Sequence, residues 1–399
     1  MGDKNQDKAL ELVDVVRALI KERSYSGEEG GAVAAAKKLF EAYGYDEVFI
    51  DTYGSIVGVM NGNRPGPTVL YDAHIDTVPV PDASVWTHSP WTGEVVDGKL
   101  YGRGTSDMKG ALGAALVACA DFARDTKRDF PGRLAVTGVV YEELFEGIAA
   151  RSFTEKFKPD YVVIGEASEL NLKRAQRGRA EVVVETFGVP AHSANPDKGV
   201  NAVYQMAKAI LEIQKIVPPE QPVLGKGILE LTDIVSTPYP GASVVPSHCR
   251  TTFDRRLLVG ETPASVLAPI QAVLDQLSAA DPKFKAKVSL AEASLVCYTG
   301  AKIGGQRFFP GWRYADDSPF VEAALKALRK VGVPAELGQY SFCTNGSHYA
   351  GEAGIKTIGF GPSRENLAHT INEHVEVSHL EAAYRGYKAL AAALTGLPC

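Results

Sequence analysis

The middle of this 399-residue sequence interrupts a regular alternation of strands and helices. Between residues 180 and 294 the hydrophobic periodicity predicts the order strand, helix, strand, strand, helix, strand. This order is typical of a compact four-stranded sheet with two helices on one face. On both sides of it, short β-branched runs alternate with helical patterns, which favours an α/β sandwich. We therefore expect two domains, the smaller inserted into the larger.

The composition is that of an ordinary globular protein, with 45% hydrophobic and 23% charged residues. The chain is long enough for two domains or three small ones, each with its own core. The formal net charge of −6 argues against a nucleic-acid partner and gives no signal for a membrane surface. The N-terminus is polar, and no apolar run approaches the roughly 18 residues of a membrane span. We therefore expect neither a signal peptide nor a transmembrane helix.

Five cysteines are scattered along the chain without any CxxC spacing. An odd, dispersed set is typical of reduced thiols and offers neither a disulfide framework nor a zinc–thiolate knot. We expect a cytoplasmic protein.

Local signals place individual elements. The segment Ser26-Gly27-Glu28-Glu29 has the pattern of a capping box and predicts a helix that runs to about Tyr43. Further helices are expected at 7–23, 107–124, 147–157, 200–216, 263–277, 319–331 and 378–394. Strands are expected at 47–51, 55–60, 68–73, 134–141, 161–165, 180–187, 227–235, 249–257, 285–291 and 357–360.

Polar residues gather where predicted strands end and helices begin. His74 and Asp76 follow one strand, and in an extended segment they face the same way, so the carboxylate can accept the imidazole N–H and fix the other ring nitrogen toward a metal. Asp107 stands in the glycine-rich stretch GRGTSDMKG, just before a helix. Taken singly, each has a plain structural alternative, such as capping a helix.

Three more carboxylates and a second histidine follow the same rule. Glu142 and Glu143 come directly after an apolar strand and point in different directions, so one can bind a metal while the other accepts a proton beside it. Glu166 ends the strand YVVIGE, and His369 lies in the run AHTINE before the last helix. Adjacent glutamates are also common on solvated surfaces, so this pair alone decides nothing.

The set as a whole is that of a metal centre. Two histidines and three carboxylates, without sulfur, suit zinc, cobalt or manganese better than copper(I) or iron–sulfur chemistry. Five protein ligands exceed what one catalytic zinc normally takes. Two metal ions that share one bridging carboxylate fit the count.

These motifs occur in the order and approximate spacing of the dinuclear zinc exopeptidase and amidohydrolase family, which the chain resembles over essentially its whole length. That family includes glutamate carboxypeptidase, acetylornithine deacetylase, succinyl-diaminopimelate desuccinylase, aminoacylase and carnosine-type dipeptidases. The resemblance implies an α/β/α catalytic domain of the zinc exopeptidase type, formed by residues 1–178 plus 296–399. It implies a ferredoxin-like βαββαβ lid and dimerisation domain at 179–295, where the segment AHSANPDKGVNA matches.

The resemblance also implies a role for each residue of the set. His74 and Glu166 are expected to bind one metal ion, and Glu143 and His369 the other. Asp107 is expected to bridge the two ions. Glu142 becomes the general base, and Asp76 orients His74. Members of the family often have a cis peptide bond after the bridging aspartate, here Asp107-Met108.

In the lid, His192 matches a histidine that reaches the partner's active site in dimers of the family and stabilises the oxyanion. Arg256 matches an arginine that grips a substrate carboxylate. Two departures from the family pattern concern substrate contacts. Ser243 stands where many relatives have asparagine, and Thr344-Asn345-Gly346 stands where many have Thr-Asp. We expect Asn345 to bind substrate.

The sequence thus predicts a metallohydrolase with two divalent cations, zinc first and cobalt or manganese as alternatives. It would cleave the amide bond of a small N-acylated amino acid or short peptide by a metal-bridged water, with Glu142 as general base. A homodimer through the lid is expected. Two alternatives stay open: ureido or other nitrogen-catabolic amides as substrates, and a catalytically silent relative that only binds.

Overall fold

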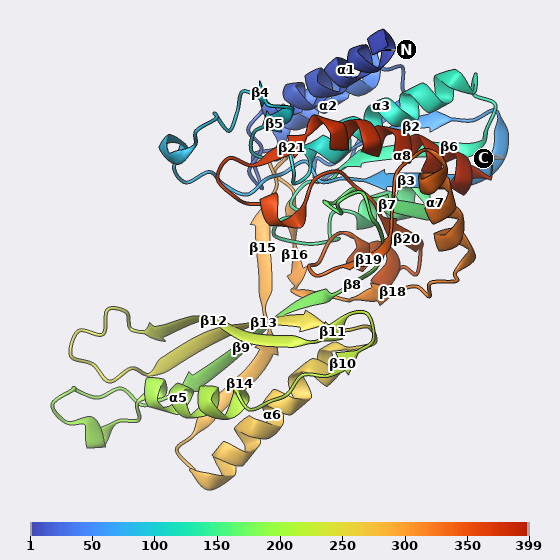
Figure 1. The fold of residues 1–399 in the computed structure, drawn as a ribbon. Coiled ribbons are helices and arrows are strands. Elements are labelled where there is room, and N and C mark those ends of the chain that lie inside the picture. The colour runs from blue at the N-terminus through green and yellow to red at the C-terminus, as the bar shows by residue number, and fades with distance from the viewer. Residues whose placement is uncertain (1, 397–399) are drawn as a thin grey trace. The chain divides into compact units, whose positions relative to one another are not determined.

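The computed structural model describes residues 2–396 and divides the chain into two compact units (Figure 1). The larger unit contains the chain through Gln176, Ser294–Gly304 and the chain from Arg313 onward. The smaller unit contains Arg177–Ala293 and Gly305–Trp312. Among residues 2–396, no helix is long and apolar enough to cross a membrane.

The larger unit is built on a nine-stranded mixed sheet. Its strands, in spatial order, are β1 (Glu47–Ile50), β2 (Ile56–Asn61), β6 (Pro131–Gly138), β3 (Arg64–Asp72), β7 (Tyr161–Ile164), β20 (Lys356–Gly359), β8 (Leu172–Gln176) and β18 (Trp312–Arg313), with β19 (Leu337–Tyr340) also paired to β8. The four strands β6, β3, β7 and β20 run parallel, so their carboxyl ends lie along one edge of the sheet.

Helices and smaller strand pairs complete this unit. The helices are α1 (Gly2–Ile20), α2 (Gly30–Ala42), α3 (Lys109–Asp125), α4 (Arg151–Phe157), α7 (Pro319–Lys330) and α8 (Val377–Thr395). The short elements are η1 (Ala83–Val85), β4 (Val95–Val96), β5 (Lys99–Tyr101), the π-helix η3 (Ser347–Glu352), η4 (Glu365–Leu367) and β21 (His374–Glu376). The paired strands β15 (Glu292–Val296) and β16 (Lys302–Gln306) each have residues in both units. The mixed α/β architecture confirms the predicted fold class.

Helix α3 is buried along most of its length, because small residues let its neighbours approach closely. A Cβ at Gly113 would lie 2.7 Å from a methyl group of Val16 on α1, and one at Gly110 would lie 2.3 Å from the carbonyl oxygen of Thr105. Close packing of this kind leaves little freedom to the helix or to the turn before it. Asp107, in that turn, is therefore held on a rigid element.

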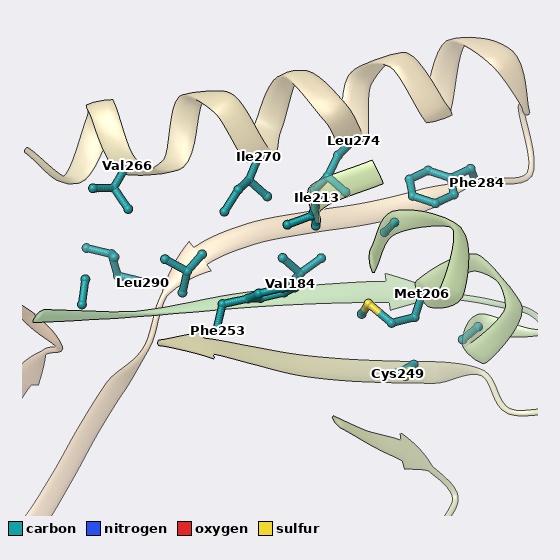
Figure 2. Packing of buried hydrophobic residues seen from close by; sticks show 14 of the residues in the cluster. Val184, Met206, Ile213, Cys249, Phe253, Val266, Ile270, Leu274, Phe284 and Leu290 are labelled. Atoms are coloured by element: carbon teal, nitrogen blue, oxygen red, sulfur yellow. The ribbon is translucent and has the colours of Figure 1, made fainter. Parts of the chain in front are cut away.

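The smaller unit has a five-stranded antiparallel sheet covered by two helices. Its elements are β9 (Gly178–Phe187), η2 (Pro196–Lys198), α5 (Ala202–Ile213), β10 (Glu220–Gln221), β11 (Gly225–Lys226), β12 (Ile228–Thr237), β13 (His248–Leu257), α6 (Pro263–Ala280), β14 (Lys285–Leu290) and β17 (Phe308–Phe309). Val184 and Phe253 of the sheet pack with Met206 of α5 and with Ile270 and Leu274 of α6 (Figure 2). These apolar contacts form the core of the unit.

Three predictions of local structure were wrong. Helix α2 begins at Gly30 without a side-chain cap, because the Ser26 hydroxyl bonds instead to Asp76 and Glu29 accepts the N–H of Gly27. The helix expected from residue 147 begins only at Arg151. Residues 305–312, expected in the larger unit, belong to the smaller one, because β17 pairs with β9 and adds a fifth strand.

Candidate metal centre

The parallel strands bring the sequence-predicted residues together at one edge of the sheet. His74 follows β3, Glu142 and Glu143 follow β6, Glu166 follows β7, and the loop after β20 carries His369. Because β6, β3, β7 and β20 are neighbours and parallel, these side chains meet outside their carboxyl ends. In open α/β sheets this edge is where ligands bind.

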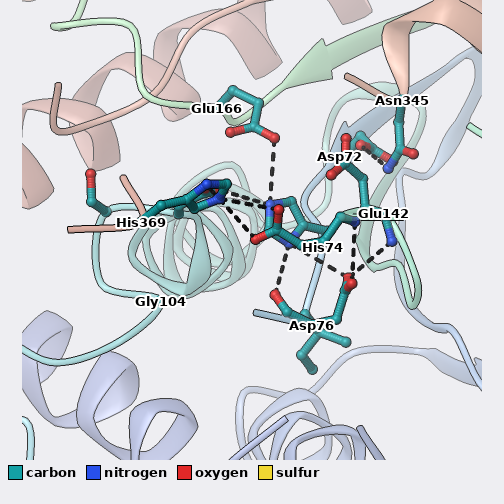
Figure 3. A network of polar contacts seen from close by, with 12 residues as sticks. Asp72, His74, Asp76, Gly104, Glu142, Glu166, Asn345 and His369 are labelled. Carbon is teal, nitrogen blue, oxygen red and sulfur yellow. Dashed lines mark hydrogen bonds and ion pairs between the residues drawn. The ribbon is translucent and has the colours of Figure 1, made fainter. Parts of the chain in front are cut away.

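The carboxylate of Asp107 contacts both histidines, which Figure 3 shows together with Glu166. Its Oδ1 lies 2.7 Å from Nε2 of His74, and its Oδ2 lies 3.0 Å from Nε2 of His369. The peptide bond Asp107-Met108 is cis, as the family resemblance predicted. One carboxylate thus presents a separate oxygen to each histidine.

Each histidine is also accompanied by a glutamate. Nε2 of His74 lies 3.5 Å from Glu166, and Nε2 of His369 lies 3.1 Å from Glu143. Nitrogen and oxygen donors within 4.8 Å of one another form two overlapping groups, the first of His74, Glu142 and Glu166, the second of His74, Asp107 and Glu143. Imidazole and carboxylate donors at these separations fit divalent cations such as zinc.

The charges in this cluster are not balanced by the residues that form it. Burial raises the pKa of Glu142 well above its usual range. Hydrogen bonds to Asp107 and Glu143 raise the pKa of His369 to about 10. Several carboxylates thus share two imidazoles in a largely buried space. Bound cations would supply the missing positive charge.

Glu142 is buried beside the other donor groups. Its side chain is only 5% exposed, and its Oε1 has no hydrogen-bond partner among the described residues. A buried oxygen without a partner is costly unless a ligand or water completes its contacts. The position next to the donor groups therefore fits a general base.

Asp76 does not orient His74 through its carboxylate, as the sequence had suggested. The Nδ1–H of His74 donates to the main-chain carbonyl of Asp76 at 2.9 Å, whereas the carboxylate is 3.7 Å away. The carboxylate instead accepts the main-chain N–H groups of Glu142 at 3.0 Å and Glu143 at 3.2 Å, and the hydroxyl of Ser26 at 2.7 Å. It fixes the backbone that carries both glutamates.

Glu373, in the AHTINE run, has a structural role that the sequence did not reveal. Its Oε1 accepts the main-chain N–H groups of Gly104, Ser106 and Asp107 at 3.0, 2.9 and 3.1 Å, and the carboxylate is paired with Arg103. Both members of this ion pair are buried. They hold the turn that aims Asp107.

The backbone around Glu166 is fixed by close packing. The hydroxyl of buried Tyr340 donates to the carbonyl oxygen of Glu166 at 3.1 Å. A Cβ at Gly361 would lie 2.0 Å from the carbonyl oxygen of Gly165 and 2.4 Å from that of Glu166. Only glycine fits there, and its neighbours hold Glu166 in place.

Asn345, expected to bind substrate, is buried in the larger unit. Its side chain is 2% exposed, and it bonds to Asp72 and to the main-chain N–H of Gly147. Burial and these bonds argue against the expected contact with substrate.

The two lid residues lie in the smaller unit. His192 is exposed, and its Nδ1 accepts the N–H of Ala194 at 3.0 Å, so Nε2 carries the proton of the neutral ring. Arg256 lies on the face of the sheet opposite Phe253 and is partly exposed, and its Nε is 2.8 Å from the carboxylate of Asp254.

The chain is similar to known proteins over most of its length. Residues 70–393 match the pattern of the family described as Peptidase family M20/M25/M40. The chain belongs to this family. The predicted resemblance to dinuclear zinc exopeptidases and amidohydrolases is thereby confirmed, and the protein is a metal-dependent hydrolase that acts on amide or peptide bonds.

Individual relatives align with 96–98% of the chain. An uncharacterised Escherichia coli protein, YgeY, is 32% identical over 97% of this chain and 95% of its own. A succinyl-diaminopimelate desuccinylase of Cereibacter sphaeroides is 28% identical over 96% and 98%. A solved structure of Bacillus subtilis YxeP, described as a dinuclear metal-binding M20 peptidase, covers 98% of this chain and 100% of its own with a TM-score of 0.72 and 14% identity, which shows the shared fold.

Proposed function

We propose that this M20 hydrolase cleaves the amide bond of a small N-acylated amino acid or short peptide with two bound divalent cations. In this proposal His74 and Glu166 bind one cation, and His369 and Glu143 bind the other. Asp107 bridges them. Zinc is the first expectation, because imidazole and carboxylate donors without sulfur suit it, and cobalt or manganese fit the same donors.

The observation that carries the proposal is the position of Asp107. A carboxylate whose two oxygens face two different histidines, at 2.7 and 3.0 Å, has the arrangement of a bridging ligand. A helix cap or a surface ion pair has no need of two imidazoles and two further glutamates around it.

The residues around the proposed metal centre have separate roles in hydrolysis. Two cations, when bound, lower the pKa of water and polarise the carbonyl of the scissile amide. Glu142 accepts the proton of the attacking water and later returns it to the leaving amine. Asp76 holds Glu142 and Glu143 at their main-chain N–H groups, so the base and the ligand keep a fixed separation.

His192 and Arg256 supply substrate contacts from the smaller unit in this proposal. The protonated Nε2 of His192 is a donor suited to a developing oxyanion, and loss of such a donor commonly lowers the rate by ~10²–10³. Arg256 is a partly exposed guanidinium that can exchange its contact with Asp254 for a substrate carboxylate.

The proposal includes a homodimer through the smaller unit. Strand β12 lies at the edge of its sheet, with Ile234 and Val235 exposed. An open edge pairs readily with a second copy of itself about a twofold axis. Helix α5 adds the exposed side chains of Tyr204 and Leu211. Light scattering should give a dimer that Ile234→Lys disrupts, while Leu10→Lys, at an exposed position of the larger unit, leaves it intact.

We also propose a cytoplasmic location. Cys119, Cys249 and Cys297 are buried free thiols, as expected of a protein kept in a reducing compartment. Cell fractionation with a tagged protein tests this directly.

The central test combines metal analysis with a substrate panel. The purified protein should contain about two divalent cations per chain, lose hydrolysis after chelation, and recover it with zinc, cobalt or manganese. The panel compares N-acetyl, N-succinyl and ureido derivatives of amino acids with dipeptides. Full activity in a cation-free preparation contradicts the proposal. If the cation-loaded protein cleaves no member of the panel, that result favours the alternative that the protein is a catalytically silent relative that only binds.

A further inference from the structure

Asn345 connects two parts of the larger unit that are distant in the sequence. Its Nδ2 donates to Oδ2 of Asp72 at 3.0 Å, and its Oδ1 accepts the main-chain N–H of Gly147 at 2.7 Å. Figure 3 shows Asn345 beside Asp72. The side chain is buried, so it can serve only groups inside the protein.

This position requires an amide. The main-chain N–H of Gly147 needs an acceptor, whereas the carboxylate of Asp72 needs a donor, and asparagine offers one of each. Aspartate at position 345 would still accept from Gly147 but would set two buried carboxylates against each other. An amide rather than a carboxylate at position 345 therefore has a local reason, which is the charge of Asp72.

Asp72 is itself firmly held. Its Oδ1 accepts the hydroxyl of Tyr349 at 2.9 Å and lies 3.3 Å from the hydroxyl of Thr137. Its main-chain carbonyl accepts the N–H of Gly165 at 2.9 Å, which ties it to the strand that leads to Glu166. A buried carboxylate whose two oxygens both accept hydrogen bonds has a fixed position and orientation.

Gly147 closes the loop that begins with the two glutamates. Its φ of +88° belongs to the left-handed region, and a Cβ there would lie 2.7 Å from Cβ of His348. The loop therefore packs directly against the segment that carries Asn345. At its start the same loop is held by the carboxylate of Asp76, which accepts the N–H groups of Glu142 and Glu143.

Both ends of the loop from Glu142 to Gly147 are thus held by carboxylates at or just after the end of strand β3. Asp76 holds the first residues directly, and Asp72 holds Gly147 through Asn345. We propose that Asn345 is a positioning residue that, paired with Asp72, sets the loop bearing Glu142 without touching substrate. The proposal rests on the proposed roles of Glu142 and Glu143.

A reciprocal exchange of the two side chains tests this. Asn345→Asp should lower kcat and zinc affinity at least tenfold and leave KM within about twofold, because two carboxylates repel and the loop shifts. Asp72→Asn should be milder, since the amide introduced at position 72 can turn its oxygen toward Nδ2 of Asn345 and its nitrogen toward the hydroxyl of Tyr349. The double variant should recover to within about threefold of Asp72→Asn. In it, the amide introduced at position 72 can donate to the carboxylate introduced at position 345, which still accepts the N–H of Gly147.

A matched control is Asn171→Asp, which exchanges another asparagine whose oxygen accepts a main-chain N–H, here from Glu336 at 3.0 Å. It should leave kcat and zinc affinity unchanged. If Asn345→Asp does not fold, recovery of a folded, zinc-binding protein by the double variant supports the pair, and failure of both variants overturns it.

The opposite result has a distinct signature. If Asn345→Asp raises KM for one acyl group and leaves kcat and zinc affinity unchanged, Asn345 contacts substrate and the proposal is wrong. Zinc affinity is measured by calorimetry on chelated protein reloaded with zinc alone, so it reports the pair even when no substrate is cleaved. Absence of hydrolysis by the wild type would overturn the proposed function while the zinc affinities of the four proteins still decide the inference.

Discussion

The carboxylate of Glu373 accepts the main-chain N–H of Asp107 at 3.1 Å. The same oxygen accepts two further N–H groups of that turn, and Arg103 compensates its charge. The last motif of the chain thus positions the central ligand of the proposed metal centre, although the two segments lie 266 residues apart. Through this contact the AHTINE run near the end of the chain fixes the orientation of Asp107 in the GRGTSDMKG stretch.

Replacement of Glu373 by glutamine should destabilise the fold by about 3–5 kcal/mol, because it leaves a buried guanidinium without a carboxylate. Zinc affinity should fall with it, because the turn loses its fixed acceptor. The double variant Arg103→Met/Glu373→Gln removes both charges and should recover part of the stability. Urea unfolding of the chelated proteins measures these free energies of unfolding. The prediction is wrong if Glu373→Gln lies within about 0.5 kcal/mol of wild type, which is the range of an ordinary surface substitution.

Asp76→Asn tests the second support of the site. Asparagine has one acceptor oxygen, so one of the main-chain N–H groups of Glu142 and Glu143 would face an amide donor. We expect kcat to fall by roughly 10–100-fold and the free energy of unfolding by about 1–3 kcal/mol. Ser26→Ala, which removes only a hydroxyl donor to the same carboxylate, is the control and should change kcat much less. Unchanged kcat in Asp76→Asn would refute this role.

The convergence of the donor residues could be predicted from the sequence because it follows from chain topology. His74, Glu166 and the pair Glu142-Glu143 each stand just after an apolar strand, and parallel strands bring their carboxyl ends to one edge. The identity of these residues is visible in motifs of a few letters. Once the order of the strands in the sheet is known, the place where these side chains converge follows from it.

The supporting contacts could not be predicted, because they depend on partners far away in the chain. Ser26 and Glu29 have the spacing of a capping box, yet Ser26 bonds to Asp76, and Glu29 accepts from Gly27 and Tyr141. Local sequence contains no sign of this competition. Asn345 is similar, since its environment is set by Asp72 and Gly147 on two other segments.

The proposed base can be separated from the proposed ligands by one substitution. Glu142→Gln should retain two cations per chain and lower kcat by ~10²–10⁴, because the amide cannot accept the proton of water. His369→Ala should instead lose a cation. Chelation should lower the melting temperature of wild type and of Glu142→Gln alike, since the carboxylates then repel one another, and zinc at ~100 times its Kd should restore about 2.7 kcal/mol per site. Metal analysis and calorimetry on the same samples check both parts, and loss of cations from Glu142→Gln would contradict the assignment.

Glu352 provides a pH dependence away from the metal centre. Burial would raise its pKa, but hydrogen bonds from His348 and Arg151 lower it from 4.5 to about 2. A carboxylate with a lowered pKa stabilises the fold above its unfolded value of 4.5, and this contribution is lost as the pH falls from there to about 2. Glu352→Gln should therefore lower the free energy of unfolding by ~1 kcal/mol near pH 6, a small value because the pair is partly exposed, and by almost nothing near pH 2. Arg151→Gln, which removes one of the two hydrogen-bond donors, should lower the free energy of unfolding near pH 6 by part of that amount. If the difference in free energy of unfolding between wild type and Glu352→Gln instead grows as the pH falls, the prediction is wrong.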